Sequence, residues 1–123
     1  MSGVSFPWPP ACLTPNAKRR SHWRRYSGAT KAYREACAWT AKSAGWHRVS
    51  DPAQHLSITF NPPDNRRRDL DGMLGAFKAG LDGIADAMGC DDSAWSLSIR
   101  RGEKVKGGAV VVALEQRGNT VAD

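Results

Sequence analysis

The sequence predicts one α/β (α+β) domain in which a mixed sheet of about four strands packs with two main helices. Two long segments repeat small or apolar residues at the three- and four-residue spacing of helices. Four short segments instead alternate polar and apolar residues or are continuously apolar, as strands are. The chain has 123 residues, 41% of them hydrophobic. That size and composition predict a single compact domain, residues 1–123, with its own core.

The expected strands follow from residue type and alternation. Residues 4–10 end in Pro-Trp-Pro-Pro, and proline cannot donate to a β-ladder, so a short edge strand is predicted there. Residues 55–60 alternate polar and apolar side chains, which predicts a strand with one buried face. Residues 95–99 alternate and residues 109–114 are apolar, with the basic loop 100–108 between them. These two segments are predicted to form a hairpin at the centre of the sheet.

Two helices are predicted, one over residues 29–44 and one from about Leu70 to Gly89. Ser27 is the expected N-cap of the first helix, and Gly45 is the residue expected to end it. The second helix contains four glycines, each of which costs about 1 kcal/mol relative to alanine. We expect close approach by another backbone, by nucleic acid or by a partner subunit at these positions. They are Gly72, Gly75, Gly80 and Gly83.

Composition limits the class of protein. No apolar run has the length of a membrane span, and the N-terminus lacks the apolar core of a signal peptide, so we expect a cytoplasmic protein without membrane contact. Three cysteines without a Cys-x-x-Cys pair predict reduced thiols. No small-molecule cofactor is expected. Residues 118–123 are predicted to be a loose tail.

The net charge of +6 is unevenly distributed along the chain. Residues 1–50 carry nine lysines and arginines against one acid, a net charge of +8. Residues 51–123 carry nine against eleven, a net charge of −2. This asymmetry is expected if one part of the protein binds phosphates and another concentrates carboxylates. A generic solubilising surface is the alternative interpretation.

Residues 16–26 form a basic segment in which cations are interleaved with aromatic side chains. Five of the eight residues from Lys18 to Arg25 are Lys or Arg, which predicts contacts with backbone phosphates. Trp23 and Tyr26 are open to two interpretations, stacking on an exposed base or packing into the core. Together with the arginine run that follows strand 55–60, the predicted DNA-binding residues are Asn16, Lys18, Arg19, Arg20, Arg24, Arg25, Arg66, Arg67 and Arg68.

The run Arg-Arg-Arg-Asp-Leu-Asp at residues 66–71 places three arginines against Asp69 and Asp71, directly before the second helix. Two carboxylates this close repel each other unless a cation lies between them. Two carboxylate donors completed by water suit Mg²⁺, with Mn²⁺ as a possible substitute. The pattern therefore predicts metal-assisted chemistry on a nucleic-acid phosphate. The alternatives are that Asp71 only caps the helix and that Asp69 only pairs with the neighbouring arginines.

Further charged residues follow this run. The acidic pair at residues 91–92 is also explained by turn chemistry alone. Lys78 stands four residues before Asp82, and Asp86 follows four residues later, so a surface ion-pair ladder explains Lys78 equally well. Three more polar residues lack a recognisable metal spacing and are predicted to be surface residues: His47, Asp51 and His55.

Taken together, these features resemble the RusA-type Holliday junction resolvases, particularly those of phages and prophages. The matching stretches run in the same order over nearly the whole chain. They are residues 7–10, 63–71, 78–86, 91–92 and 104–108. The most specific of them is the Arg-Arg-Arg-Asp-Leu-Asp run followed about twenty residues later by Asp-Asp.

The resemblance implies a Mg²⁺-dependent endonuclease that works as a homodimer on four-way DNA junctions. Such an enzyme resolves the junction by paired symmetric nicks during recombination and repair, in a bacterial cell or a phage-infected host. The resemblance also implies that Asp69, Asp71 and Asp92 hold the metal. Asp91 is then a turn residue or a supporting group.

This chain departs from the family pattern at two positions. Many relatives carry asparagine where this chain has Gly72, and better-known members carry lysine where it has Gly75. Lys78 lies on roughly the same helix face, and we expect it to take over the role of that cation as a fourth catalytic residue. Two alternatives remain open. One is a DNA-binding dimer that has lost nuclease activity, and the other is a metal-dependent nuclease acting on flaps or RNA.

Overall fold

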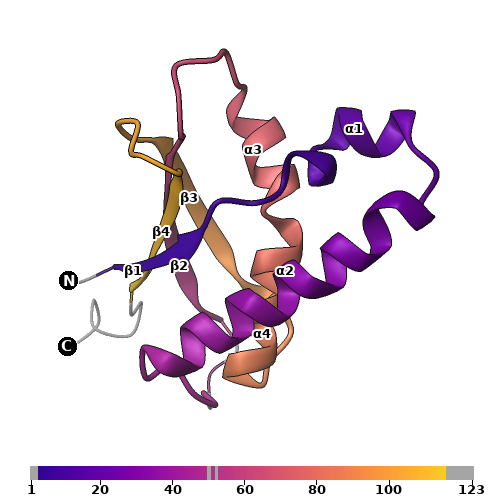
Figure 1. The fold of residues 1–123 in the computed structure, drawn as a ribbon. Coiled ribbons are helices and arrows are strands. Elements are labelled where there is room, and N and C mark those ends of the chain that lie inside the picture. Colours follow the sequence, from indigo (N-terminus) through magenta and orange to yellow (C-terminus); the bar gives the residue numbers. More distant parts are fainter. Residues whose placement is uncertain (1–2, 50, 52, 116–123) are drawn as a thin grey trace.

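The computed structural model describes residues 3–49, 51 and 53–115, and it confirms the expected fold class. A mixed four-stranded sheet lies against helices gathered on one side of it (Figure 1). The strands are β1 (Val4–Pro7), β2 (His55–Asn61), β3 (Ser96–Arg101) and β4 (Ala109–Glu115). The α-helices are α1 (Pro15–Arg20), α2 (Arg24–Ser43), α3 (Leu70–Ala76) and α4 (Lys78–Met88). Two short 3-10 helices are η1 (Ala11–Leu13) and η2 (Asp92–Ala94).

The strand order is β1-β4-β2-β3, so the predicted hairpin of the last two strands is wrong. β3 pairs with β2 in parallel, and β4 pairs antiparallel with both β1 and β2. Parallel neighbours need a crossover connection, and α3 and α4 supply it between β2 and β3. The chain then returns past β2 to place the apolar β4 in the centre. The prediction that residues 4–10 begin with an edge strand is confirmed, since β1 pairs with β4 alone.

The core lies between the sheet and the helices. Leu56, Ile58 and Phe60 alternate along β2 and are fully buried, as the sequence pattern predicted. Val110 and Val112 continue this buried layer on β4. The opposite side chains of β2 are only half-buried, so the helices cover one face of the sheet.

The predicted second helix is broken at Phe77, which separates α3 from α4. The Phe77 ring is fully buried and packs edge-on against Phe6 of β1, Tyr33 of α2 and Phe60 of β2, at centroid distances of 6.2, 6.2 and 6.1 Å. Continuous apolar spacing hides this break, because both helices present apolar residues to the same core. The predicted end at Gly89 is confirmed by its left-handed backbone, with φ of 66°.

The first long helix starts earlier than predicted. α2 begins at Arg24, after Trp23, and its first turn is held by backbone bonds such as that from the Ser27 N–H to the Trp23 carbonyl (2.9 Å). Ser27 therefore lies inside the helix and is not its N-cap. Gly45 follows the end of the helix with φ of 92°, as expected. The basic segment before α2 forms a separate short helix, α1, which the sequence analysis missed.

Helix α2 is anchored by groups buried on its inner face. The Tyr33 hydroxyl donates to the Pro7 carbonyl oxygen (2.5 Å), which ties α2 to β1. Burial raises the pKa of Tyr33, and it raises the pKa of the Cys37 thiol to about 11. Cys12, Cys37 and Cys90 are all free thiols, as predicted. Among the described residues, no helix is both long enough and apolar enough to cross a membrane.

The helix glycines are explained in part by close packing. A Cβ on Gly83 would collide with the Arg34 carbonyl oxygen and lie 2.9 Å from the Ala38 nitrogen, both on α2. A Cβ on Gly75 would lie 2.6 Å from Cγ of Pro15 on α1. Gly72 has open space around it. The expected close backbone approach is thus found at α2–α4 and is made within this chain. The predicted tail at residues 118–123 lies outside the described residues.

Replacing Gly83 with alanine is expected to destabilise the fold, because the backbone of α2 cannot yield as a flexible side chain would. We expect a loss of about 1–3 kcal/mol in the free energy of unfolding. Urea denaturation followed by far-UV circular dichroism measures it. Gly28→Ala is the matched control, since Gly28 lies in α2 with nothing within 4 Å of its Cβ position. It should stabilise the protein by about 0.4–1 kcal/mol, and equal effects of the two changes would contradict the packing argument.

Candidate functional site

The two aspartates of the central motif lie where the segment after β2 enters α3. Asp69 occupies the N-cap position with extended backbone (φ −90°, ψ 147°), and its side chain makes no capping hydrogen bond within the described structure. Asp71 is the second residue of the helix, so it is not the cap. Its Oδ1 accepts only from the adjacent Gly72 N–H among the described residues (3.0 Å). Asp69 is therefore not used in starting the helix, and Asp71 uses one oxygen there while its Oδ2 has no hydrogen-bond partner among the described residues.

The neighbouring arginines turn to a different carboxylate. Arg68 Nη1 donates to Asp64 Oδ1 (2.8 Å), and Arg66 Nε lies 3.8 Å from Asp64 Oδ2. The hydrogen bond from Arg68 is the main cause that lowers the pKa of Asp64. Asp69 and Asp71 have no ion-pair partner in the part of the chain that the structure describes. The alternative that Asp69 only pairs with its neighbouring arginines is therefore not what the structure shows.

A hollow of about 480 Å³, called here the aspartate hollow, contains both carboxylates. One wall comes from η1 and α1, and the other comes from the end of the arginine run and from α3. Figure 1 shows α1 beside the first turns of α3. The polar side chains in the lining are Thr14, Asn16, Arg19, Arg67, Arg68, Asp69 and Asp71. The structure thus brings six predicted site residues together from segments about fifty residues apart.

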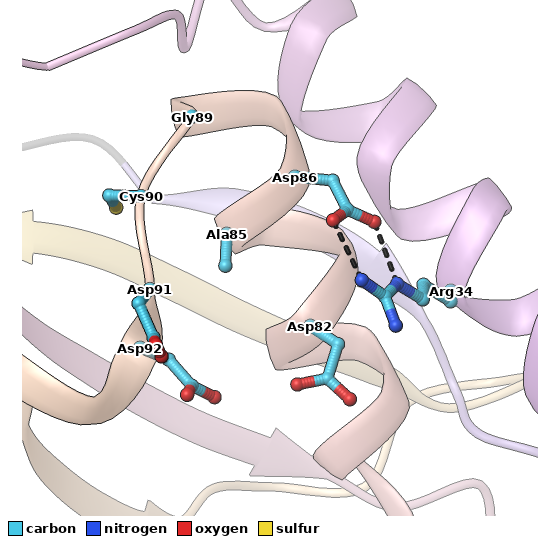
Figure 2. Close-up of a pocket in the computed structure, with 8 residues that line it drawn as sticks. All are labelled: Arg34, Asp82, Ala85, Asp86, Gly89, Cys90, Asp91 and Asp92. Atoms are coloured by element: carbon cyan, nitrogen blue, oxygen red, sulfur yellow. Dashed lines mark hydrogen bonds and ion pairs between the residues drawn. The ribbon is translucent and has the colours of Figure 1, made fainter.

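The third predicted carboxylate lines a different hollow, of about 540 Å³, on the side of α4 and η2. Figure 2 shows the Asp82, Asp91 and Asp92 carboxylates grouped there, while Asp86 turns away to Arg34. Asp91 caps η2, where its Oδ1 accepts from the Ser93 N–H (3.0 Å). Asp91 is therefore the turn residue that the sequence analysis expected.

Lys78 crosses from the first turn of α4 to this acidic group. Its Nζ donates to Asp92 Oδ2 (3.0 Å), and this bond is the main cause that raises the pKa of Lys78. The charges of Asp82 and Asp91 add to the effect, while burial opposes it. The alternative of an ion-pair ladder within the helix is not found among the described residues, because Lys78 pairs with Asp92 and Asp86 pairs with Arg34. Lys78 and Asp92, two of the four predicted catalytic residues, thus form one ion pair.

The fit of these residues to a divalent metal is partial. Nowhere in residues 3–49, 51 and 53–115 do three His, Cys, Asp or Glu side chains cluster closely enough to hold a metal ion. The two carboxylates of the aspartate hollow, free of ion pairs in the described structure, match the donor set that Mg²⁺ takes when it keeps several waters. Asp69 and Asp71 are the residues that could hold Mg²⁺ here. Asp92 is engaged by Lys78 and is not gathered with them.

The predicted DNA-binding residues divide between the hollow and the surface beyond it. Asn16 and Arg19 line the hollow, and the Arg19 guanidinium donates to the Asn16 side chain. Lys18 lies over the Tyr26 ring, 5.5 Å from its centroid. Arg67 and Arg68 line the hollow as well. The other four members are exposed cations. They are Arg20, Arg24, Arg25 and Arg66.

The structure decides between the two interpretations of the aromatics in the basic segment. Tyr26 is partly buried and packs against the core. Trp23 is 57% exposed at the corner between α1 and α2. Only Tyr26 thus follows the packing interpretation.

Several residues of the two hollows escaped sequence reasoning. Trp8 and Pro15 line the aspartate hollow, and Arg34 lines the acidic one. The Thr-Pro pair that starts α1 was an available signal, since the Thr14 hydroxyl accepts from the Ala17 N–H and Pro15 takes the first helical position.

His55 was expected on the surface, but it lies half-buried in β2. It hydrogen-bonds Ser96 and Ser98, at 2.6 and 2.8 Å.

Comparison with known proteins gives little further information about the function. No family model matches the chain. A relative from Xylella fastidiosa, described as an uncharacterized protein, is 44% identical over 95 residues. The match covers 75% of this chain and 61% of the relative, so the chain spans less than two thirds of that protein's length.

The Arg34–Asp86 pair joins α2 to α4 by two hydrogen bonds, of 2.7 and 2.8 Å, and predicts an acid-dependent loss of stability. The bond from Arg34 lowers the pKa of Asp86. The stabilisation is therefore complete above the ordinary pKa of aspartate, about 3.9, and is lost as pH falls through the lower pKa of the folded protein.

At neutral pH, Asp86→Asn is expected to cost about 1 kcal/mol or less, because both partners are nearly half exposed. Thermal unfolding of wild type and variant across the acid range measures the difference, which should shrink as the pH falls. Asp82→Asn is the control on the same helix, since Asp82 has no ion pair among the described residues. A difference that persists unchanged in acid would contradict this assignment.

Proposed function

We propose that this chain is a Mg²⁺-dependent, structure-specific endodeoxyribonuclease that resolves four-way DNA junctions by paired symmetric nicks. The observation that carries the proposal is the composition of the aspartate hollow. Two carboxylates, free of ion pairs in the described structure, share it with Asn16, Arg19 and two arginines of the central motif. Carboxylates for a metal beside cations for phosphates are what phosphodiester hydrolysis requires. The resemblance to RusA-type resolvases supports the same activity.

In the proposed mechanism, the cations of the hollow bind the strand. Arg19 and Arg67 bind phosphate oxygens on opposite walls, and Arg68 is held in place by Asp64 and lies over the Trp8 ring. Asp69 and Asp71 would hold Mg²⁺, for which Mn²⁺ can substitute. Bound there, the metal supplies an activated water and neutralises charge on the scissile phosphate. Water would attack the phosphorus and the bond from phosphorus to the 3′ oxygen would break, so that the 3′ oxygen takes up a proton as a 3′-hydroxyl and the other strand end keeps a 5′-phosphate.

The ion pair of Lys78 and Asp92 is proposed to take part in the same reaction, in addition to the charged residues of the aspartate hollow. Lys78 begins α4 immediately after Phe77, on the helix that continues from α3. We assign it the cation role that the missing lysine at position 75 fills in relatives. A lysine at position 75 is incompatible with the packing of this chain, because Pro15 occupies the space of its Cβ. A cation placed farther along the helix avoids that collision.

The proposal includes a homodimer, because paired nicks on opposed strands require two sites related by symmetry. It also places the protein in the cytoplasm of a bacterial cell or a phage-infected host, where recombination and repair take place.

One specific observation favours the second candidate, a DNA-binding dimer without nuclease activity. Asp92 is neutralised by Lys78 and does not join Asp69 and Asp71 in the aspartate hollow. A two-carboxylate site would then bind DNA but lack the third ligand that the resemblance implies. The two candidates make different predictions: the nuclease cuts DNA when Mg²⁺ or Mn²⁺ is present, and the DNA-binding dimer cuts with neither metal.

We expect the purified protein to nick a synthetic four-way junction symmetrically in Mg²⁺ and not in chelator. Asp71→Asn should reduce the rate by about a hundred-fold or more, because it removes a charged metal ligand without changing its size. Denaturing gel electrophoresis of end-labelled strands measures both the rate and the positions of the nicks. Asp51→Asn is the control, since Asp51 is exposed and lies outside the hollow.

Asp71→Asn should still bind the junction, because the substitution removes negative charge from a phosphate-binding surface. Binding by both proteins without cutting in Mg²⁺ or Mn²⁺ would instead establish the non-catalytic alternative. If the protein cuts flaps or RNA in preference to junctions, the proposed metal site is kept and only the proposed substrate is wrong.

Arg67→Ala is expected to weaken junction binding and to lower its salt dependence. Each lost phosphate contact reduces the slope of log K against log salt concentration by about 0.9. Fluorescence anisotropy in chelator over a range of salt concentrations measures the slope. Lys42→Ala is the matched charge control, since Lys42 lies in the last turn of α2. Equal slopes for Arg67→Ala and wild type would exclude Arg67 from the phosphate-binding surface.

A further inference from the structure

Trp23 occupies the corner at which the basic segment turns from α1 into α2. Its side chain is 57% exposed, although the same segment buries Tyr26 against the core. Figure 1 shows this corner standing out from the body of the protein. A single exposed apolar residue is ordinary on a protein surface. Trp23 differs from an ordinary exposed residue in the groups that surround its ring and in the position of the corner beside α1.

The surroundings of Trp23 are cationic and aromatic. The Arg24 guanidinium carbon lies 5.7 Å from the centroid of its ring, and the His22 ring lies 5.9 Å away with a tilt of 32°. The last turn of α1 adds three more cations just before the corner. Backbone bonds from Tyr26 and Ser27 to the Trp23 carbonyl hold the residue in the first turn of α2. The indole is thus held on ordered backbone beside groups that attract phosphates.

Helix α1 connects this corner to the aspartate hollow. Asn16 and Arg19 of α1 line the hollow, and the helix ends at Arg20, three residues before Trp23. Six helical residues span about 9 Å, roughly the length of one to two nucleotides of an extended strand. A strand whose phosphate lies in the hollow would reach the indole within a few nucleotides.

We propose that Trp23 stacks on an unpaired nucleobase of the DNA strand whose phosphate lies in the aspartate hollow. An aromatic face flanked by backbone-binding cations is how proteins hold single-stranded nucleic acid, because every base has a π-face to stack on. Bases already unpaired are the cheapest to engage, since no base pair must be broken. The ligand is therefore an unpaired base at a branch point. This inference rests on the proposed function for the position of the strand.

Trp39 provides a control in the helix that follows Trp23. It lies within α2 and is more exposed than Trp23, at 72%. Within the described residues it takes part in no aromatic pair and no cation–π contact. If exposure of a tryptophan alone favoured DNA binding, replacing Trp23 or Trp39 would have the same effect. If a base stacks on the ring beside the aspartate hollow, only the replacement of Trp23 weakens binding.

The test compares Trp23→Ala, Trp23→Phe and Trp39→Ala with wild type. Affinities for a short oligothymidylate, for a blunt duplex and for a four-way junction are measured by fluorescence anisotropy in chelator, so that nothing is cut. Trp23→Ala should lose about ten- to hundred-fold in affinity for the oligothymidylate and keep its affinity for the duplex. Trp23→Phe should recover most of the loss, and Trp39→Ala should bind as wild type does. The salt slope should stay unchanged in Trp23→Ala, because no charge is removed.

Three results would overturn the inference. They are an affinity of Trp23→Ala for the oligothymidylate within about two-fold of wild type, an equal loss on the duplex, and an equal loss in Trp39→Ala. Circular dichroism of each variant establishes that the fold is intact. If the alanine variant unfolds, Trp23→Leu keeps the test decisive, because leucine keeps an apolar side chain without a π-face and should lose affinity for the oligothymidylate as the alanine variant would. Cleavage of the junction in Mg²⁺ is measured separately. If the wild type cuts the junction and Trp23→Ala binds the oligothymidylate as tightly as the wild type, the stacking inference alone is wrong. If Trp23→Ala loses affinity for the oligothymidylate but the wild type never cuts, the proposed nuclease activity alone is wrong.

Discussion

The buried ring of Phe77 is the contact on which the rest of the structure depends. It touches β1 through Phe6, β2 through Phe60 and α2 through Tyr33, so one side chain joins the sheet to the helical layer. The same residue lies between the end of α3 and the start of α4. On one side of Phe77, α3 lies against α1, and on the other side α4 lies close along α2. Gly80 makes room for this arrangement, because a Cβ at that position would approach the Phe77 ring to 2.6 Å. The aspartate hollow is lined by α3 and the acidic hollow by α4, so the two hollows lie on either side of this core contact in the chain.

A second close contact assembles the aspartate hollow. Pro15 of α1 sits where a side chain at position 75 would begin, which brings the basic N-terminal segment beside the two aspartates of the central motif. The glycine at this position therefore has a packing reason, and it cannot be read simply as the loss of a catalytic lysine. Gly72 differs, because open space surrounds it and the structure offers no packing reason for a glycine there. Of the two departures from the RusA-type pattern, only Gly72 remains without a structural explanation.

Local patterns predicted what local physics determines. The buried face of β2, the left-handed glycines that follow α2 and α4, and the edge position of β1 could all be read from residue type and spacing. The neighbours of each strand could not be predicted, because neither the alternation along β3 nor the apolar run of β4 carries information about which strand lies between them. The break at Phe77 was hidden by apolar spacing that continues on both sides of it. For the site, the carboxylate pair and its cations were found from the sequence, whereas the partition of Asp92 into a separate ion pair depends on tertiary placement. The direction of Trp23 and Tyr26 was open for the same reason.

The ion pairs show that the arginines of the central motif do not pair with the two aspartates beside them in the sequence. Three arginines stand next to two aspartates in the sequence, and direct pairing would have neutralised both sets. Instead Asp64 binds Arg68 closely and Arg66 at a longer distance. Asp69 and Asp71 are left without an ion pair in the described structure, and Arg68 is fixed beside them over the Trp8 ring. Asp64 thus acts as a local counter-charge that leaves the two site carboxylates available to another cation. A surface that only keeps the protein in solution has no need of this separation, whereas the proposed function requires it, because the proposed site attracts a metal ion and a phosphate at neighbouring positions.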